Sequence, residues 1–122
     1  MATLLVNTGK AIVTNYLIGS AATQPKYAGW GTGAGTTAAT DTTLFTETGT
    51  RVSGTTTQQT TTTTNDTYQV IATISASGTV TITNAGLFDA STSGNLFVKG
   101  DFTGIGLTSG DSIQFTFKTQ FS

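Results

Sequence analysis

The stretch SIQFTFK at residues 112–118 decides the fold class, because apolar and polar residues alternate along it without interruption. Neighbouring side chains of a β-strand point to opposite faces, so this period of two predicts a strand with one apolar and one polar face. The apolar row consists of Ile113, Phe115, Phe117 and Phe121. We therefore expect the C-terminal segment to be a strand that buries this row.

The same period of two runs back through most of the chain, in short segments separated by turn residues. Strands are predicted over residues 26–30, 51–64, 68–75, 79–83, 85–88 and 96–102. The segments 65–67 and 77–78 supply turns, and residues 31–43, almost all Gly, Thr and Ala, form a loop. Short strands with a turn every 8–12 residues or so are typical of sandwiches and small barrels. The predicted fold class is therefore all-β, an antiparallel β-sandwich or a jelly-roll-like barrel.

One short helix is predicted near the N-terminus, over residues 9–18. Asn7 or Thr8 can cap its start, apolar residues recur at helical spacing after them, and Gly19 stands where a C-terminal glycine belongs. A chain of 122 residues has the length of one domain. We expect residues 1–20 to form an N-terminal arm with the short helix, and residues 26–122 to form the sandwich or barrel.

Threonine makes up 31 of the 122 residues, and it clusters at 55–57 and 60–64. Its branched Cβ suits a pleated strand, but a strand with Thr on both faces has a weakly specified register. Such a strand depends on a neighbour, which is either another strand of the same sheet or a partner subunit. We predict an oligomer interface on it; the residues assigned to that interface are Thr57, Thr60, Thr62 and Thr64.

The composition excludes the classes of site that need His or Cys. The chain has no His and no Cys, which removes disulfides, thiolate nucleophiles, the Ser-His-Asp triad and His- or Cys-ligated metals. Five basic residues and a net charge of −1 are unlike a nucleic-acid binder, and no apolar run approaches the ~20 residues of a membrane span. The start lacks the features of a signal peptide, so we expect synthesis in the cytosol. We predict no enzyme activity, cofactor, metal or small-molecule substrate.

Three local patterns resemble ligand motifs, and each has a plainer interpretation. Residues 29–34 fit G-x-G-x-x-A but lead into no helical pattern, which favours a loop over a dinucleotide site. Residues 89–96 resemble half a calcium loop, yet Gly100 stands where the bidentate Glu belongs, which favours a hairpin. Trp30 and Tyr27 are either ligand-stacking aromatics or, as we expect for Trp30, core.

Six segments of the chain resemble a family of small tailed-phage virion proteins. These segments are NTGKAIVTN (7–15), KYAGWGTG (26–33), QTTTTTNDTY (59–68), NAGLFDA (84–90), GNLF (94–97) and GDSIQFT (110–116). Together they cover most of the chain. Family members often have their genes among those for head proteins, and some carry tail-fibre names.

The resemblance implies a capsid decoration, or cement, protein. Such proteins sit outside the icosahedral head, often as trimers, and hold neighbouring major capsid protein subunits together. We therefore expect a homotrimer that binds the major capsid protein, located on the outer capsid surface and, during assembly, in the host cytoplasm. Low charge predicts binding that depends only weakly on salt, and many repeated contacts supply avidity.

The residues that contact the capsid are predicted from the sequence alone. The apolar run Leu4, Leu5 and Val6 before the helix, within the segment 2–6, makes a suitable arm, although it is also consistent with an ordinary first strand. Trp30 and Thr32, at the start of the Gly-rich segment 31–40, are the second candidates.

Other classes remain as alternatives. A tail-fibre or tail-tip module that binds a host receptor should show exposed aromatic side chains around a concave site. A tail-tube subunit should form rings and polymerise, and an ice- or surface-binding protein should present a flat face of Thr.

Overall fold

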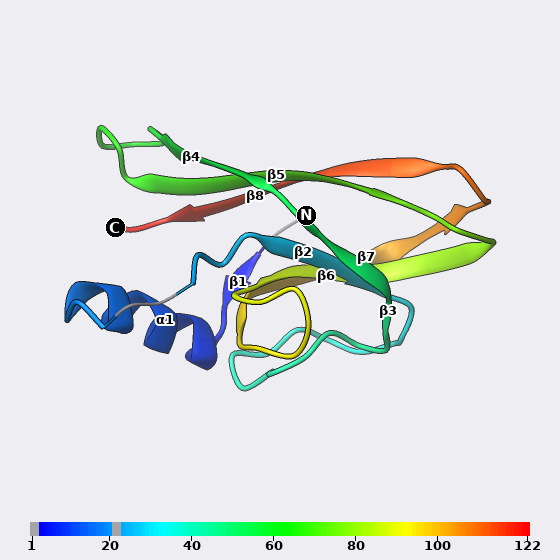
Figure 1. Ribbon diagram of the computed structural model, residues 1–122, viewed down its shortest axis with the longest axis horizontal. Helices are drawn as coiled ribbons and strands as arrows, with labels where there is room; N and C mark the ends of the chain where they lie inside the picture. Colours follow the sequence, from blue (N-terminus) through cyan, green and yellow to red (C-terminus); the bar gives the residue numbers. More distant parts are fainter. Residues whose placement is uncertain (1–2, 21–22) are drawn as a thin grey trace.

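The computed structural model describes residues 3–20 and 23–122 and arranges their strands in two packed antiparallel sheets (Figure 1). One sheet has five strands in the order β1-β7-β6-β2-β3, and the other has three in the order β4-β5-β8. The elements are β1 (Leu4–Leu5), α1 (Asn7–Leu17), β2 (Tyr27–Gly31), β3 (Glu47–Ser53), β4 (Thr55–Gln59), β5 (Thr67–Ser75), β6 (Val80–Phe88), β7 (Leu96–Leu107) and β8 (Ser112–Gln120). The predicted all-β sandwich with one short helix is confirmed.

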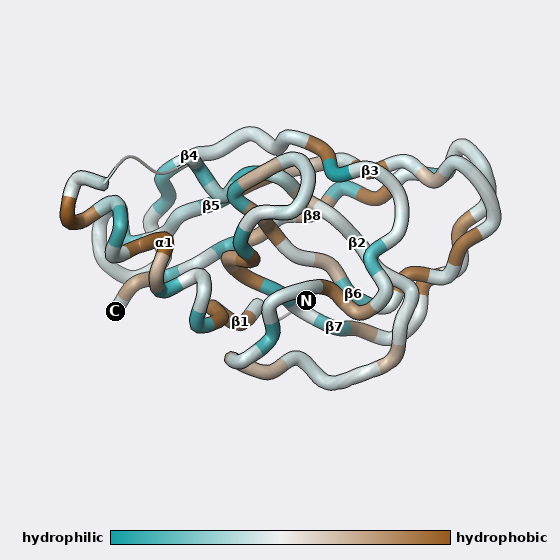
Figure 2. The backbone as a smooth tube through the Cα atoms, turned by 60° about the horizontal axis from the view of Figure 1, so that its bottom comes forward, coloured by the Kyte–Doolittle hydropathy of each residue, from teal (hydrophilic) through white to brown (hydrophobic). Residues whose placement is uncertain are grey.

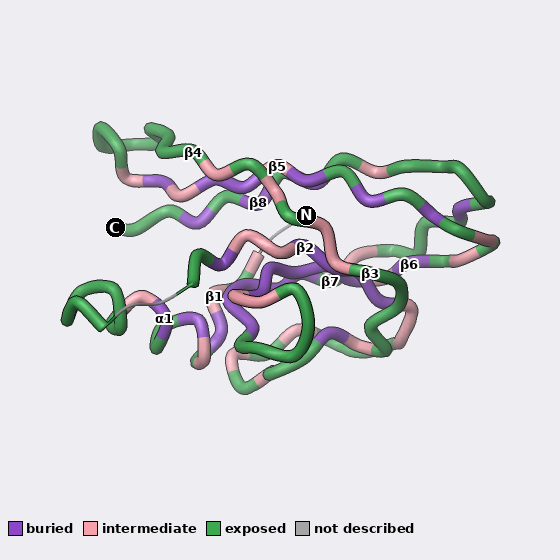
Figure 3. Tube along the Cα trace, in the orientation of Figure 1, coloured by how far each residue is buried: buried purple, intermediate pink, exposed green. Residues whose placement is uncertain are grey.

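The core lies between the two sheets, where buried residues of β5 and β8 face those of β2, β6 and β7 (Figure 3). The alternation along β8 works as predicted: Phe115 and Phe117 are buried and Ile113 is half-buried. The ring of Phe115 meets the ring of Trp30 edge-on, with the centroids 6.5 Å apart. This contact joins the sheets through large apolar side chains, which contribute most of the burial free energy in such cores.

The chain passes from one sheet to the other at Gly54, between β3 and β4. In Figure 1 these two strands run as one diagonal segment from the lower layer to the upper layer. The Gly54 amide donates to the carbonyl of Lys26 over 2.8 Å, and a Cβ at position 54 would lie only 2.4 Å from Cγ1 of Val70. A side chain at this corner would therefore displace a core residue.

Several strand boundaries differ from the prediction. The two strands predicted over 79–83 and 85–88 are one strand, β6, which continues through the buried Asn84. The single strand predicted over 51–64 is wrong: residues 51–53 end β3 in one sheet, β4 belongs to the other sheet, and residues 60–66 form a loop. Two further strand segments were missed: residues 47–50 of β3 and residues 103–107 of β7. Gly-rich and Thr-rich sequence carries little apolar pattern. Pairing with a neighbouring strand therefore determines whether these segments form strands.

Helix α1 begins two residues earlier than predicted and packs directly on β7. Val6 is the N-cap, and the hydroxyl of Thr8 donates to the carbonyl of Leu96 over 2.6 Å. A Cβ at Gly9 would lie 2.1 Å from the carbonyl oxygen of Phe97, so only glycine allows this approach. The helix ends as predicted before Gly19, whose φ of 76° reverses the chain.

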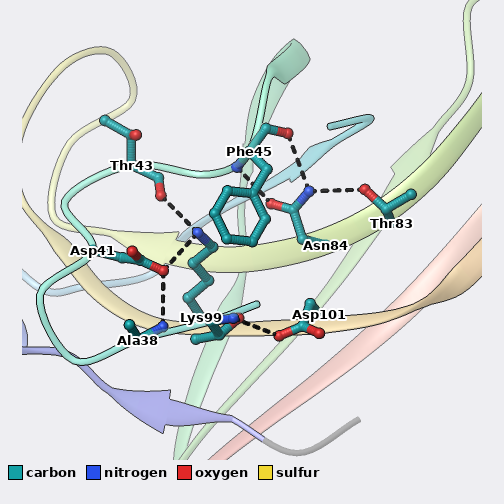
Figure 4. Close-up of polar contacts among 9 residues, drawn as sticks. Ala38, Asp41, Thr43, Phe45, Thr83, Asn84, Lys99 and Asp101 are labelled. Atoms are coloured by element: carbon teal, nitrogen blue, oxygen red, sulfur yellow. Dashed lines mark hydrogen bonds and ion pairs between the residues drawn. The ribbon is translucent and has the colours of Figure 1, made fainter. Parts of the chain in front are cut away.

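The loop 32–46 covers the outer face of the five-stranded sheet and is held there by Lys99 (Figure 4). The side chain of Lys99 is fully buried; its Nζ lies 2.9 Å from Oδ2 of Asp41 and donates to the carbonyl of Thr43 over 3.0 Å. The ammonium group also lies 3.2 Å from the centre of the Phe45 ring. A hydrogen bond from the Ala38 amide, reinforced by Lys99, lowers the pKa of Asp41 below its usual range.

Asn84 fixes the other end of this loop. Its Oδ1 accepts the amide of Phe45 over 3.0 Å, and its Nδ2 donates to the Phe45 carbonyl over 3.1 Å. The Asn84 side chain thus makes hydrogen bonds with both the amide and the carbonyl of Phe45, as the backbone of a neighbouring strand would. This pairing explains why a polar residue interrupts the apolar pattern of β6 without ending the strand.

We predict that the Lys99–Asp41 pair is needed to keep the loop in place. Removing one partner of a buried pair leaves an uncompensated charge, so Asp41→Ala should lower the free energy of unfolding by about 2–3 kcal/mol. Lys99→Met should cost less, and the double variant should be more stable than Asp41→Ala alone. Denaturant unfolding measures all three. The control is Lys10→Met on the exposed face of α1, and an equal effect of this change and Asp41→Ala would contradict the prediction.

Candidate functional site

An apolar groove lies between helix α1 and the C-terminal end of the chain. We call it the helix groove and define it by Tyr16, Leu17, Tyr68, Phe97 and Phe121; its volume is about 320 Å³. Figures 1 and 2 both place the C-terminus beside α1, and Figure 2 shows hydrophobic segments along that helix. The groove therefore joins segments from the two ends of the sequence.

Large apolar side chains stand in water at this groove. Leu17 is 79% exposed, Ile18 just beyond the helix is 77% exposed, and Tyr16 and Phe121 are 45% and 46% exposed. Single exposed apolar residues are ordinary, but a group of them around a concave site is typical of an interaction surface. Sequence analysis missed this site, because Phe121 was assigned to the buried row of β8. The strand ends at Gln120, so that row runs out into water.

The floor of the groove is rigid and uncharged. The ring of Tyr68 meets the ring of Phe97 edge-on at 5.7 Å, and its hydroxyl donates to the carbonyl of Pro25 over 2.9 Å. Burial raises the pKa of Tyr68 well above its usual value, so the phenol keeps its proton. No residue that lines the groove has a formal charge at neutral pH. The surface that the groove offers is therefore mainly apolar.

The predicted oligomer interface lies in two kinds of structure. Thr57 is on β4, at the edge of the three-stranded sheet, whereas Thr60, Thr62 and Thr64 are in the loop 60–66. All four residues are exposed. A subunit contact at these residues stays a prediction.

Asp66 is the reason why the run of threonines folds back as a loop. Its carboxylate accepts the amides of Thr61, Thr62 and Thr63 over 2.8, 3.0 and 2.9 Å, and it also accepts Nε2 of Gln120 over 3.1 Å. The amide bonds from Thr61 and Thr63 contribute most to lowering the pKa of Asp66 far below its usual value. The carboxylate thus accepts the backbone amides that a neighbouring strand would accept if residues 61–63 were part of a sheet.

The predicted capsid-contact residues are divided between surface and interior. Leu4 and Leu5 pair with β7 as strand β1, so the first-strand alternative holds for this part of the arm, and Ala2 lies outside the described residues. The side chains of Val6 and Trp30 are buried, at 0% and 3% exposure, so the expectation that Trp30 is core is confirmed and neither side chain offers surface for a capsid contact. Their apolar surface is used in this chain's own core. A contact at Leu4, Leu5 or Thr32 stays a prediction.

The weak ligand motifs take the plainer interpretation in each case. Residues 29–31 belong to strand β2 and lead into a loop, not into a helix. Asp89 closes the loop 89–95 by accepting the amide of Asn95 over 2.7 Å. Arg51 holds the same loop by donating to the carbonyls of Ala90 and Ser93 over 2.8 and 2.6 Å. Within residues 3–20 and 23–122, no three His, Cys, Asp or Glu side chains gather as metal ligands would.

The comparison with known families matches almost the whole chain. The matching family model is described as podophage GP4 fiber I protein gp80, and the match covers residues 5–120. The chain belongs to this family. It is therefore a structural protein of a phage particle, which is the general class that the sequence resemblance implied. No match was found among curated proteins or among solved structures.

No helix within residues 3–20 and 23–122 is long and apolar enough to cross a membrane.

We predict that Asp66 controls the order of the loop 60–66. Asp66→Ala should raise amide hydrogen exchange at residues 61–63 at least tenfold, because three donors lose their acceptor. Asp111→Ala is the matched control, since Asp111 accepts the Thr108 amide in a different turn, over 2.8 Å. If exchange at residues 61–63 rises equally in both variants, the prediction is wrong.

The lowered pKa of Asp66 also predicts how this loop responds to pH. A depressed folded pKa gives stability that is present above the unfolded value and is lost only as the pH falls through the folded value. The amide resonances of residues 61–63 should therefore stay in place as the pH is lowered from about 7 to about 3, although an ordinary Asp is mostly protonated at the lower limit. A titration midpoint near the ordinary value of Asp would contradict this assignment.

Proposed function

We propose that the chain is a non-catalytic structural module of the fibre apparatus on the outside of a phage particle. Two observations support this proposal. The family whose model matches residues 5–120 is described as a fibre protein. The helix groove also combines exposed aromatic side chains with a concave site, which is the feature expected of a fibre or tail-tip module.

The shape of the fold indicates which part of a fibre it would form. A compact domain of this length has a radius of gyration of roughly 14 Å. A fibre shaft needs an extended or repeated structure, whereas both sheets here pack on one core. The chain therefore fits an attachment or tip module better than a shaft.

The helix groove is the surface through which we propose that this module binds its neighbour, an apolar segment of another virion protein. Its lining has no formal charge, and the Tyr68 hydroxyl is already bonded within the chain. A glycan would need several free hydrogen-bonding groups, which this lining does not concentrate, whereas apolar side chains of a protein need none. Binding should then change little with salt concentration.

The second candidate is the decoration of the head that the sequence resemblance implied. In this function the protein binds the major capsid protein from outside, as a homotrimer, and stabilises contacts between capsid subunits. The compact sandwich without a shaft favours it, because a decoration protein needs only a folded unit and repeated weak contacts.

One mixing experiment separates the two functions. The purified protein is added to decoration-free heads and to isolated tails or fibres, and both are sedimented. Stoichiometric binding to tails or fibres supports the proposal. Binding to heads, with a higher melting temperature of the shell, supports decoration instead. Binding to neither, together with binding to a host glycan, would replace both with a receptor-binding function.

We predict that the helix groove carries the binding. Leu17→Ser and Phe121→Ser should each weaken binding to the particle at least tenfold. Both side chains stand at the surface, so the free energy of unfolding should change by less than about 0.5–1 kcal/mol. Ile105→Ser is the matched control, because Ile105 is an exposed apolar residue on β7 outside the groove. Equal loss of binding in the control would show that the groove is not the contact.

A further inference from the structure

Strand β4 leaves one whole edge of the three-stranded sheet open. Its five residues pair with β5 in an unbroken register, from Thr55 opposite Ile71 to Gln59 opposite Thr67. Within residues 3–20 and 23–122, no strand pairs on its other side, since β4 is the last strand in the order β4-β5-β8. Four of the five residues are exposed. Figure 3 shows this strand mainly in the colour of exposed residues. An open edge of this kind offers unpaired N–H and C=O groups to another strand.

The other sheet edges have features that block pairing, and β4 has none of them. Edge strands are normally protected by charges, proline, bulges or short length. Among the described strands, β1 has only two residues, and the part of β7 that it leaves without a neighbour carries the charge of Asp101. Strand β3 carries Glu47 and Arg51 and pairs with β2 through an irregular register. At the edge strand β8, Lys118 supplies a charge. Strand β4 has the sequence TTTQQ, with no charge, no proline and no register shift.

We propose that β4 pairs with β4 of a second copy of this chain, antiparallel and about a twofold axis that passes beside Thr57. This register places Thr57 opposite Thr57, Thr56 opposite Gln58 and Thr55 opposite Gln59. Every pair is uncharged and able to hydrogen-bond, and the strand is complementary to itself as a twofold contact requires. The inference is compatible with the fibre function, but not with the homotrimer of the head-decoration alternative.

Two features favour a closed dimer over an open chain of subunits: the distance between the two Lys118 side chains, and the identity of the strands at the outer edges of the joined sheet. The joined sheet would run β8-β5-β4-β4-β5-β8, so the two Lys118 side chains would lie five strand spacings apart, about 24 Å. This distance exceeds the Debye length of about 8 Å at physiological salt, so their repulsion is screened. Both outer edges of the joined sheet would then be β8. The charge of Lys118 on each edge disfavours the addition of a further subunit. Pairing of β4 with β8 in a ring about an axis along the strands would instead be parallel, because β4 and β8 both run antiparallel to β5.

The mass of the full chain in solution tests the pairing. Analytical ultracentrifugation over a concentration series up to millimolar should show a monomer–dimer equilibrium. Thr57→Lys and Thr57→Glu should each raise the dimer dissociation constant at least tenfold, because like charges then meet at the axis. A mixture of the two variants should restore a mixed dimer, since Lys then faces Glu. Thr116→Lys, the same change on the exposed face of β8, should leave the dimer unchanged.

A cross-link tests the register independently of affinity. The chain has no cysteine, so Thr57→Cys introduces a single thiol directly opposite its copy, and mild oxidation should give a disulfide-linked dimer. Thr116→Cys should stay monomeric under the same conditions. A wild-type monomer throughout the series, a trimer, a dimer that survives both charged variants, or equal cross-linking at both positions would each overturn the proposal.

Discussion

The buried ammonium group of Lys99 is the constraint on which the outer layer of this protein depends. A charge that is fully removed from water must be compensated by fixed partners, and the partners here are Asp41, a backbone carbonyl and an aromatic ring, all on the loop 32–46. The same loop accepts the amide of Asn7 at the carbonyl of Ala39, over 2.8 Å. One buried cation therefore links β7, the long loop and the start of α1. The loop thus adds a contact at the start of the helix, which is also held directly on β7 by the bond from Thr8 to Leu96.

The two sheets share one core but differ in what covers their outer faces. Apolar side chains of both sheets fill the space between them, and the outer face of the five-stranded sheet is closed by the loop 32–46. The three-stranded sheet has a mostly polar outer face, where Thr, Gln and Ser of β4, β5 and β8 surround the single apolar residue Ile71. A virion protein makes its contacts through the surface that its own fold leaves uncovered, and here that surface includes the β4 edge and the helix groove.

These two surfaces lie next to each other. Gln24, Tyr68 and Phe121 line the helix groove, and they also line the adjoining hollow along Thr56, Thr57 and Gln58. Contact between copies and contact with another virion protein would thus occur at the same end of the sandwich. Neighbouring copies could then present their grooves together, which raises the effective concentration of each at a repeated particle surface.

The sequence by itself determined the all-β class, the short helix and the path of β8, because periods of two and of 3.6 follow from local geometry. It also showed that the chain has no His and no Cys, which many catalytic and metal sites use. It did not determine that residues 60–64 leave the sheet, since Thr suits a strand equally well and only the carboxylate of Asp66 gathers their amides. It did not determine the burial of Val6 and Lys99, or the exposure of Phe121, because these depend on which segments cross over which face. The candidate site joins a helix near the N-terminus to a residue near the C-terminus, and only tertiary packing brings two such distant segments together.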